Sequence, residues 1–256
     1  MIVTTAGRTT EEYIAKAKAV ANDLQVAYEP RRKKSLQALF KMHTLVVVVG
    51  KDGIQLYHQD GSEPYFFHPN LAMVRVKRLM NDSHDAFIEV AGLKQGDALL
   101  DCTLGYASDS IVASFVVGET GKVIGVEASH ILAYLTKIGL QTWEGQHEEI
   151  EKAMRRITVV EGNHYDYLQR MPSKSVDVVY FDPMFEESID ESNALQTLSH
   201  FTSFASITDE IIAEARRVAR RRIVLKDHFR STRFEQLGFT QHIRKTAKFH
   251  YGTIDL

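Results

Sequence analysis

From about residue 93 onward, short apolar segments alternate with amphipathic ones, and this alternation limits the possible folds more than any other feature of the sequence. Each apolar segment contains a near-continuous run of apolar residues, which is typical of strands buried on both faces. The segments between them repeat apolar residues at helical spacing. Such alternation favours an α/β fold with a mostly parallel sheet, helices on both faces and right-handed crossovers. The expected strands are DALLDCT (97–103), KVIGVEA (122–128), RITVVEG (156–162), VDVVYFDP (176–183) and RRIVLKD (221–227), and the expected helices span 107–117, 130–140, 164–171 and 207–220.

The first part of the chain follows a different pattern. Residues 10–27 predict a helix, and residues 44–61 predict two short strands around an Asp-Gly turn, since this dipeptide suits a tight hairpin. Residues 69–91 predict a helical lead-in with Leu71, Val74, Arg75 and Arg78 on successive turns and a break at 81–83. We therefore expect a small α+β region over residues 1–68 and the main domain over 69–256, which ends in edge strands.

Composition excludes several classes of protein. The chain has 256 residues, of which 44% are hydrophobic, and its apolar runs are far shorter than the roughly 20 residues that a membrane span requires. The amino terminus does not resemble a secretory signal, and a single cysteine, Cys102, rules out an internal disulfide framework and a cysteine-based zinc site. The histidines lack metal-ligand spacing, so we predict no metal. A cytoplasmic location fits this composition best.

Polar residues follow the first two strands of the main domain, where ligands bind in open α/β sheets. Asp101, Thr103, Gly105 and Asp109 surround the first turn, and Glu127 ends the next strand. The turn lacks the Gly-Lys-Ser/Thr of a phosphate loop and a full G-x-G-x-x-G, and its two carboxylates suit a cationic ligand. The acid at the end of the second strand is placed to accept hydrogen bonds from ribose hydroxyls. A ribose with a cationic tail indicates S-adenosylmethionine.

The sequence VVYFDPMF at 178–185 is the most specific motif. A proline after the strand-end acid forces extended backbone at Asp182 and removes an amide donor. An exocyclic amino group of a base could donate to the Asp182 carboxylate and a backbone carbonyl while Phe185 stacks on the ring. We therefore predict a catalytic group at the end of this strand, formed by Asp182, Pro183, Met184 and Phe185.

Together, DCTLGYASD, VIGVEAS, VVEGNHYDYL and VVYFDPMF resemble class I S-adenosylmethionine-dependent methyltransferases, in particular the family of the small-subunit ribosomal RNA guanine-N2 methyltransferase. The resemblance covers about residues 86–229 and implies a Rossmann-like sheet with an antiparallel last strand. It also implies a binding site for S-adenosylmethionine in which the adenine of this cofactor lies near Asn163. The residues implied at this site are Asp101, Thr103, Gly105, Asp109, Glu127, Ala128, Asn163, His164 and Asp182. The first 68 residues instead resemble uncharacterised methyltransferase-like proteins of Gram-positive bacteria.

The predicted activity is methylation of an exocyclic nitrogen, most simply guanine N2 in ribosomal RNA. A net charge of −2 and the acidic run at 186–191 argue against a phosphate-rich substrate, so two alternatives remain. One is a methyltransferase for a small molecule or DNA, and the other is a binding module without transfer activity. Basic groups could line a path for RNA phosphates. These are Arg31 to Lys34, Arg75, Lys77, Arg78 and Arg216 to Arg222.

Overall fold

The computed structural model describes residues 1–145, 147–183 and 207–256, and its contacts group them into two compact units. The first unit spans residues 1–67, and the second begins at His68. Within the described residues, no helix combines the length and the apolar character that crossing a bilayer requires.

The first unit is built on a four-stranded sheet with the order β2-β1-β3-β4. Its strands are β1 (Ile2–Thr5), β2 (Ala27–Tyr28), β3 (Leu45–Gly50) and β4 (Gly53–His58), and its helices are α1 (Glu11–Asp23) and α2 (Leu36–Phe40). The predicted helix and hairpin are both present, and Thr10 caps α1 through its side chain. The sequence analysis missed β1 and β2, which pair in parallel with each other, and β1 also pairs in parallel with β3. The sheet is therefore mixed.

Two helices lead into the second unit, α3 (Asn70–Met80) and α4 (Ala86–Ala91), with the predicted break between them. Two of the residues whose spacing predicted α3, Leu71 and Val74, are 70% and 58% exposed. The helix instead buries the smaller Ala72 and Val76 and packs against α5 (Ser108–Val117). Packing against this neighbour, which spacing alone does not reveal, selects the buried face.

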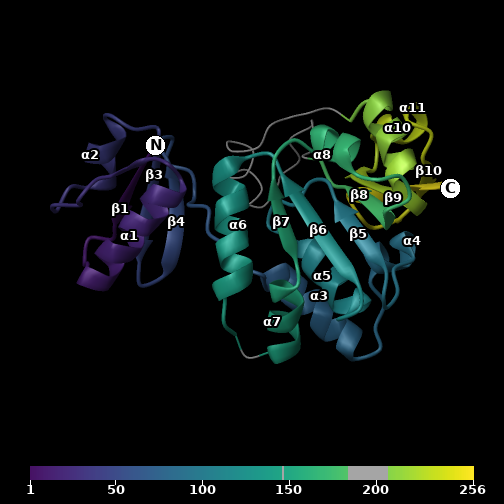
Figure 1. Ribbon diagram of the computed structural model, residues 1–256, viewed down its shortest axis with the longest axis horizontal. Coiled ribbons are helices and arrows are strands. Elements are labelled where there is room, and N and C mark those ends of the chain that lie inside the picture. Colours follow the sequence, from purple (N-terminus) through teal and green to yellow (C-terminus); the bar gives the residue numbers. More distant parts are fainter. Residues whose placement is uncertain (146, 184–206) are drawn as a thin grey trace. The chain divides into compact units, whose positions relative to one another are not determined.

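The second unit contains a seven-stranded sheet with the order β10-β11-β9-β8-β5-β6-β7 (Figure 1). The strands are β5 (Ala98–Asp101), β6 (Lys122–Glu127), β7 (Thr158–Glu161), β8 (Val176–Phe181), β9 (Ala219–His228), β10 (Thr240–His242) and β11 (Phe249–Asp255). Strands β5 to β9 run parallel, whereas β11 is antiparallel to both β9 and β10. This confirms the predicted α/β class and the antiparallel last strand. Because β11 lies between two strands, only β10 is an edge strand at that end.

Helices flank this sheet as the alternation predicts. Besides α5 they are α6 (His130–Thr142), α7 (Glu148–Arg155), α8 (His164–Arg170), α10 (Asp209–Val218) and α11 (Arg233–Gln236). Helix α7 packs against α5 and α6, and α10 packs against α8. Consecutive residues of β6 and β8 are buried, as expected of strands covered on both faces. The sequence analysis missed α7, a charged helix that buries only Ile150, Ala153 and Met154.

Candidate functional site

The strand order reverses beside β5, which has β6 on one side and β8 on the other. Such a switch point is where open α/β sheets bind ligands, outside the carboxyl ends of their strands. The register pairs Asp101 with Gly125 of β6 and with Tyr180 of β8, so the three strand ends lie side by side. Asp101, Glu127 and Asp182 therefore stand at one edge of the sheet, the edge toward which the arrows of β5 and β6 point in Figure 1.

The turn after β5 is held by Asp101. One carboxylate oxygen accepts a hydrogen bond from the backbone amide of Thr103 (3.0 Å), and the other accepts one from the hydroxyl of Ser110 (2.7 Å). Gly105 has a φ of 49°, in the left-handed region that glycine tolerates best. Asp101 is only 2% exposed, and burial raises the pKa of its carboxyl group to about 7.

Glu127 joins the end of β6 to the same turn. Its Oε2 accepts from the amide of Gly105 (3.1 Å) and its Oε1 accepts from the amide of Ser129 (2.9 Å). A further backbone hydrogen bond comes from Ala128, and burial raises the pKa of the Glu127 carboxyl. Each carboxylate oxygen has a second lone pair, so both can still accept a hydrogen bond from a ligand hydroxyl.

Asp182 and Thr103 connect the ends of β8 and β5. The backbone amide of Asp182 donates to Oγ1 of Thr103 (2.6 Å), which fixes the start of the Asp-Pro motif beside the first turn. The side chain of Asp182 is 26% exposed, more than that of Asp109, which is 9% exposed. Pro183 is half-buried next to it. Met184 and Phe185, the rest of the predicted catalytic group, lie outside the described residues.

Asp109 is surrounded by protein donors. Its carboxylate accepts from the guanidinium of Arg75, from the hydroxyl of Tyr180 (2.9 Å) and from the ammonium of Lys226 (3.3 Å). Although burial raises the pKa of Asp109, the charges of Lys226 and Arg75 hold it well below its usual range. These contacts indicate that Asp109 fixes the positions of Arg75, Tyr180 and Lys226 in the site. Direct contact between Asp109 and the cofactor stays a prediction.

Lys226, on β9, is a residue of this site that the sequence analysis missed, as it did Ser110 and Tyr180. Its Nζ lies 2.6 Å from Oδ2 of Asp182 and 3.3 Å from Asp109, and it stands over the Phe249 ring at 5.0 Å. Burial lowers the pKa of Lys226, but the two carboxylates outweigh this effect and raise it overall. Because one ammonium serves two acids, burial still raises the pKa of Asp182 to about 6. A lysine in the apolar run RRIVLKD, at a strand end, was the signal in the sequence.

The two residues predicted beside the adenine differ in accessibility. Asn163 is exposed, and its Oδ1 caps α8 by accepting from the amide of Tyr165 (2.7 Å). Its NH₂ group and the second lone pair of its Oδ1 remain to meet a ligand. The His164 imidazole is only 7% exposed and packs edge-on against Phe181, and burial lowers its pKa. The imidazole is therefore buried in the protein.

Within the described residues of the second unit, Arg75 and the basic cluster near the start of β9 are committed to other contacts. Arg75 is committed to Asp85 and Asp109. The basic cluster lies at the amino end of β9, away from the site, and bonds to acids and carbonyls there. Arg220 pairs with Asp177, and Arg221 pairs with Asp97. Arg217 and Arg222 likewise donate to backbone carbonyls. The cluster therefore stabilises the fold at a distance from the strand ends that carry the site.

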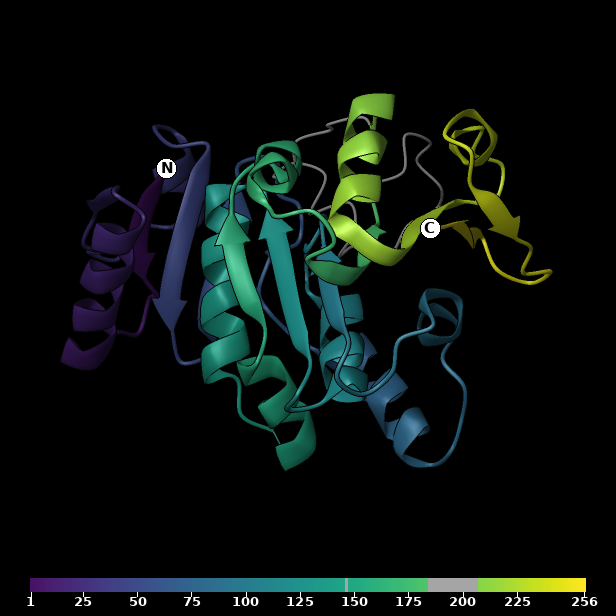
Figure 2. The ribbon, with the colours of Figure 1, turned by 45° about the vertical axis from the view of Figure 1, so that its right-hand side comes forward.

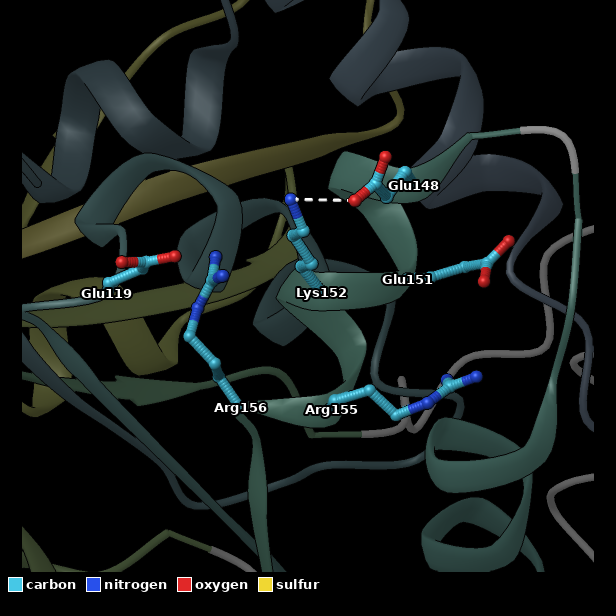
Figure 3. Close-up of a pocket in the computed structure, with 6 residues that line it drawn as sticks. All are labelled: Glu119, Glu148, Glu151, Lys152, Arg155 and Arg156. Carbon is cyan, nitrogen blue, oxygen red and sulfur yellow. Dashed lines mark ion pairs between the residues drawn. The ribbon is translucent and has the colours of Figure 1, made fainter.

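A depression of about 580 Å³ lies elsewhere on the second unit (Figure 3). Its charged lining consists of Glu119, Glu148, Glu151, Lys152, Arg155 and Arg156, from the segments that enter β6 and β7. It therefore lies at the amino ends of these strands. Arg155 donates to two backbone carbonyls and Arg156 to a third, so both arginines have structural roles. No group of three or more potential metal ligands occurs in the part of the chain that the structure describes.

Comparisons with known proteins agree with this geometry. The SAM-dependent methyltransferase NGO1261 from Neisseria gonorrhoeae superimposes with a TM-score of 0.63, at 17% sequence identity, over 100% of this chain and 96% of that one. This likeness assigns the second unit to the Rossmann-like methyltransferase fold. A family model described as "Putative SAM-dependent methyltransferase" matches residues 33–250, and the chain belongs to this family. The protein is thus an enzyme that uses S-adenosyl-L-methionine.

Two relatives of known sequence differ in how much of the chain they match. The uncharacterized protein YpiP of Bacillus subtilis is 44% identical over 254 residues, which cover 99% of this chain and 98% of YpiP. Ribosomal RNA small subunit methyltransferase J of Actinobacillus succinogenes is 27% identical over 149 residues, 56% of each chain.

The residues at the strand ends fit the cofactor. Among the described residues, and apart from its two chain neighbours, nothing lies within 4 Å of the position that a Cβ on Gly162 would take, so this turn after β7 borders open space. Glu127 can accept from two ribose hydroxyls. The acids at the ends of β5 and β8 give a cationic methionine moiety favourable surroundings.

Proposed function

We propose that the protein methylates the exocyclic amino group of a base in RNA, most simply N2 of guanine in ribosomal RNA. The observation that carries this proposal is Asp182 at the switch point of the sheet: Thr103 holds its backbone amide, and its partly exposed carboxylate pairs with Lys226. The distant similarity to ribosomal RNA small subunit methyltransferase J supports RNA as the substrate class. Such a substrate would place the enzyme in the cytoplasm.

The chemistry follows from the position of the carboxylate. Bound adenosylmethionine supplies an electrophilic methyl group. Asp182 accepts a hydrogen bond from the substrate amine and so directs the nitrogen lone pair toward that methyl, which is catalysis by positioning. As the N–C bond forms and the S–C bond breaks, the electron pair of the latter stays on sulfur. The nitrogen becomes cationic and loses a proton to Asp182, which is largely ionised at pH 7 because its pKa is about 6.

Asn163 and Glu127 would bind the adenosine part of the cofactor. Glu127 accepts from the ribose hydroxyls, and the Asn163 amide and the backbone of His164 meet the adenine edge. Phe185, three residues after Asp182 in the sequence, would stack on the target base.

The test is transfer of a radiolabelled methyl group to defined acceptors. Ribosomal RNA from a bacterium that lacks the gene for this protein should take up label, because its target is unmodified. Double-stranded DNA and a nucleoside mixture should not. Asp182→Asn should reduce transfer by at least about 100-fold, as loss of a positioned proton acceptor does. Asp166→Asn, which changes an exposed carboxylate on α8, is the matched control. Label in DNA or nucleosides alone, or full activity of Asp182→Asn, would contradict the proposal.

A further inference from the structure

The carboxyl end of β9 continues into a surface that the sequence analysis did not single out. Strand β11 is antiparallel to β9 and pairs Phe249 with His228, so the chain before β11 lies beside the chain after β9. Both segments lie at the same edge of the sheet as Asp182, because β9 is parallel to β8. Figure 2 shows β10 and β11 in yellow, at the end of the sheet away from β7. We call residues 228–230 and 243–249 the β9–β11 surface.

Hydrogen bonds hold the two segments of this surface together. The amide of Phe229 donates to the carbonyl of Lys248 (3.2 Å), and Nε2 of Gln241 donates to the carbonyl of Phe229 (3.0 Å). On the other side, Nε2 of His250 lies 3.2 Å from the carbonyl of Arg244. The surface is therefore formed in advance, and a ligand need not order it.

Cations and aromatic rings alternate on this surface. The Arg230 guanidinium lies 5.0 Å from the Phe229 ring, and Arg244 lies 4.9 Å from the Phe249 ring. Phe229 is 38% exposed, and Lys245 and Lys248 are exposed beside it. One nitrogen of Arg244, Nη1, is buried and makes no hydrogen bond within the described part of the chain. Residues 228–250 contain five basic side chains and one acidic one, Glu235.

The β9–β11 surface is continuous with the proposed catalytic carboxylate. Arg244 and Lys226 both lie over the Phe249 ring, at 4.9 and 5.0 Å from its centre. Lys226 in turn pairs with Asp182 at 2.6 Å. A ligand that lies on this surface would therefore have its next unit at Asp182.

We propose that the β9–β11 surface binds single-stranded RNA adjacent to the nucleotide that is methylated, with phosphates on its basic side chains and a neighbouring base on Phe229. This inference rests on the proposed function and names the part of the protein that receives the RNA. Exposed aromatic rings among cations are what unstacked bases require, whereas a paired helix offers no free base faces. Charge attraction alone would not need an exposed ring.

The experiment measures the affinity of a fluorescein-labelled 15-nucleotide single-stranded RNA of mixed sequence at several salt concentrations. The test variant is Lys245→Gln/Lys248→Gln. The control is Lys122→Gln/Lys152→Gln, which removes the same charge from exposed positions at the amino ends of the strands. Each phosphate contact on a single strand contributes about 0.7 to the slope of log affinity against log salt. The test variant should lose about 1.4 of slope and roughly 10- to 30-fold in affinity near 0.1 M salt.

A second variant separates base stacking from charge. Phe229→Ala should weaken RNA binding roughly 5- to 150-fold at every salt concentration while keeping the wild-type slope. A poly-glutamate peptide serves as the competing acidic ligand and should displace the RNA only weakly. All variants should bind adenosylmethionine as the wild type does, which shows that they are folded.

The outcomes are distinct. If the wild type binds RNA tightly and the test and control variants have equal affinities and slopes, the proposal that the β9–β11 surface binds RNA is overturned, and the proposed function stands. Efficient displacement by poly-glutamate, together with no effect of Phe229→Ala, would assign the surface to an acidic protein and overturn the proposal. No RNA binding by the wild type with adenosylmethionine bound would overturn both the surface and the RNA substrate.

Discussion

Asp101→Asn should make the second unit more stable at neutral pH, although it changes a residue of the cofactor site. Asn has the same shape, its Oδ1 can accept from the amide of Thr103, and its Nδ2 can donate to the Ser110 hydroxyl. A protonated Asp101 would make the same contacts, since its pKa is raised by burial to about 7. The variant therefore imitates the neutral carboxyl at every pH.

The magnitude follows from the pKa. The carboxyl has a reference value of 3.8 and a folded-state value of about 7, and each unit corresponds to about 1.36 kcal/mol. As the pH rises above about 4, the unfolded chain loses this proton while the folded chain keeps it, so stability falls. The fall ends near pH 7, where the folded state also ionises, and totals on the order of 4 kcal/mol. Asn cannot ionise, so the variant lacks this contribution.

The assay is urea unfolding followed by the fluorescence of Trp143, the single tryptophan, which follows α6 in the second unit. The difference in unfolding free energy between Asp101→Asn and the wild type should grow between pH 4 and 7 and then stay constant. Effects of other groups cancel in this difference. Asp166→Asn, at an exposed position on α8, should show no comparable growth. A difference for Asp101→Asn that stays flat from pH 4 to 8 would refute the reasoning.

Three further predictions concern the site. Glu127→Ala should weaken adenosylmethionine binding at least about 10-fold in calorimetric titration, because two hydrogen-bond acceptors are lost; an unchanged Kd would remove this residue from the cofactor site. Lys226→Met should cost about 3 kcal/mol at pH 8 in the unfolding assay, since a buried acid loses its partner, and less below pH 6, where Asp182 takes up a proton. An equal cost at both pH values would contradict the shared ion pair. Gly125→Ala should destabilise the second unit by about 1–3 kcal/mol, because its Cβ would stand 2.3 Å from Cδ1 of the buried Leu104; a Tm equal to that of the wild type would contradict this packing.

Much of the fold could be predicted because its main determinants are local. Strands buried on both faces are mostly apolar, so β5, β6 and β8 could be recognised in the sequence as runs of apolar residues. Helix α7 was missed because a helix with one narrow apolar stripe and five charged residues in eight resembles a solvated loop. Strand β11 was expected at an edge because its alternating pattern does not reveal that β10 pairs with its other side.

Sequence alone also determined which acids meet at the site. Carboxyl ends of parallel strands converge on one edge, so residues that follow strands are neighbours whatever their separation in the chain. Asp101, Glu127 and Asp182 were predicted together for that reason, and the structure brings them to one edge.

Tertiary structure alone decided which cations pair with Asp109 and Asp182. Asp109 forms ion pairs with Arg75, 34 residues away in the sequence, and with Lys226, 117 residues away. Lys226 also pairs with Asp182. In the structure Asp109 and Arg75 bind each other, a pairing that the sequence analysis did not predict. Burial makes charge pairing decisive, since an acid removed from water needs a partner within a few ångströms. Which partner comes that close depends on the packing of α3 and β9, and no local pattern records it.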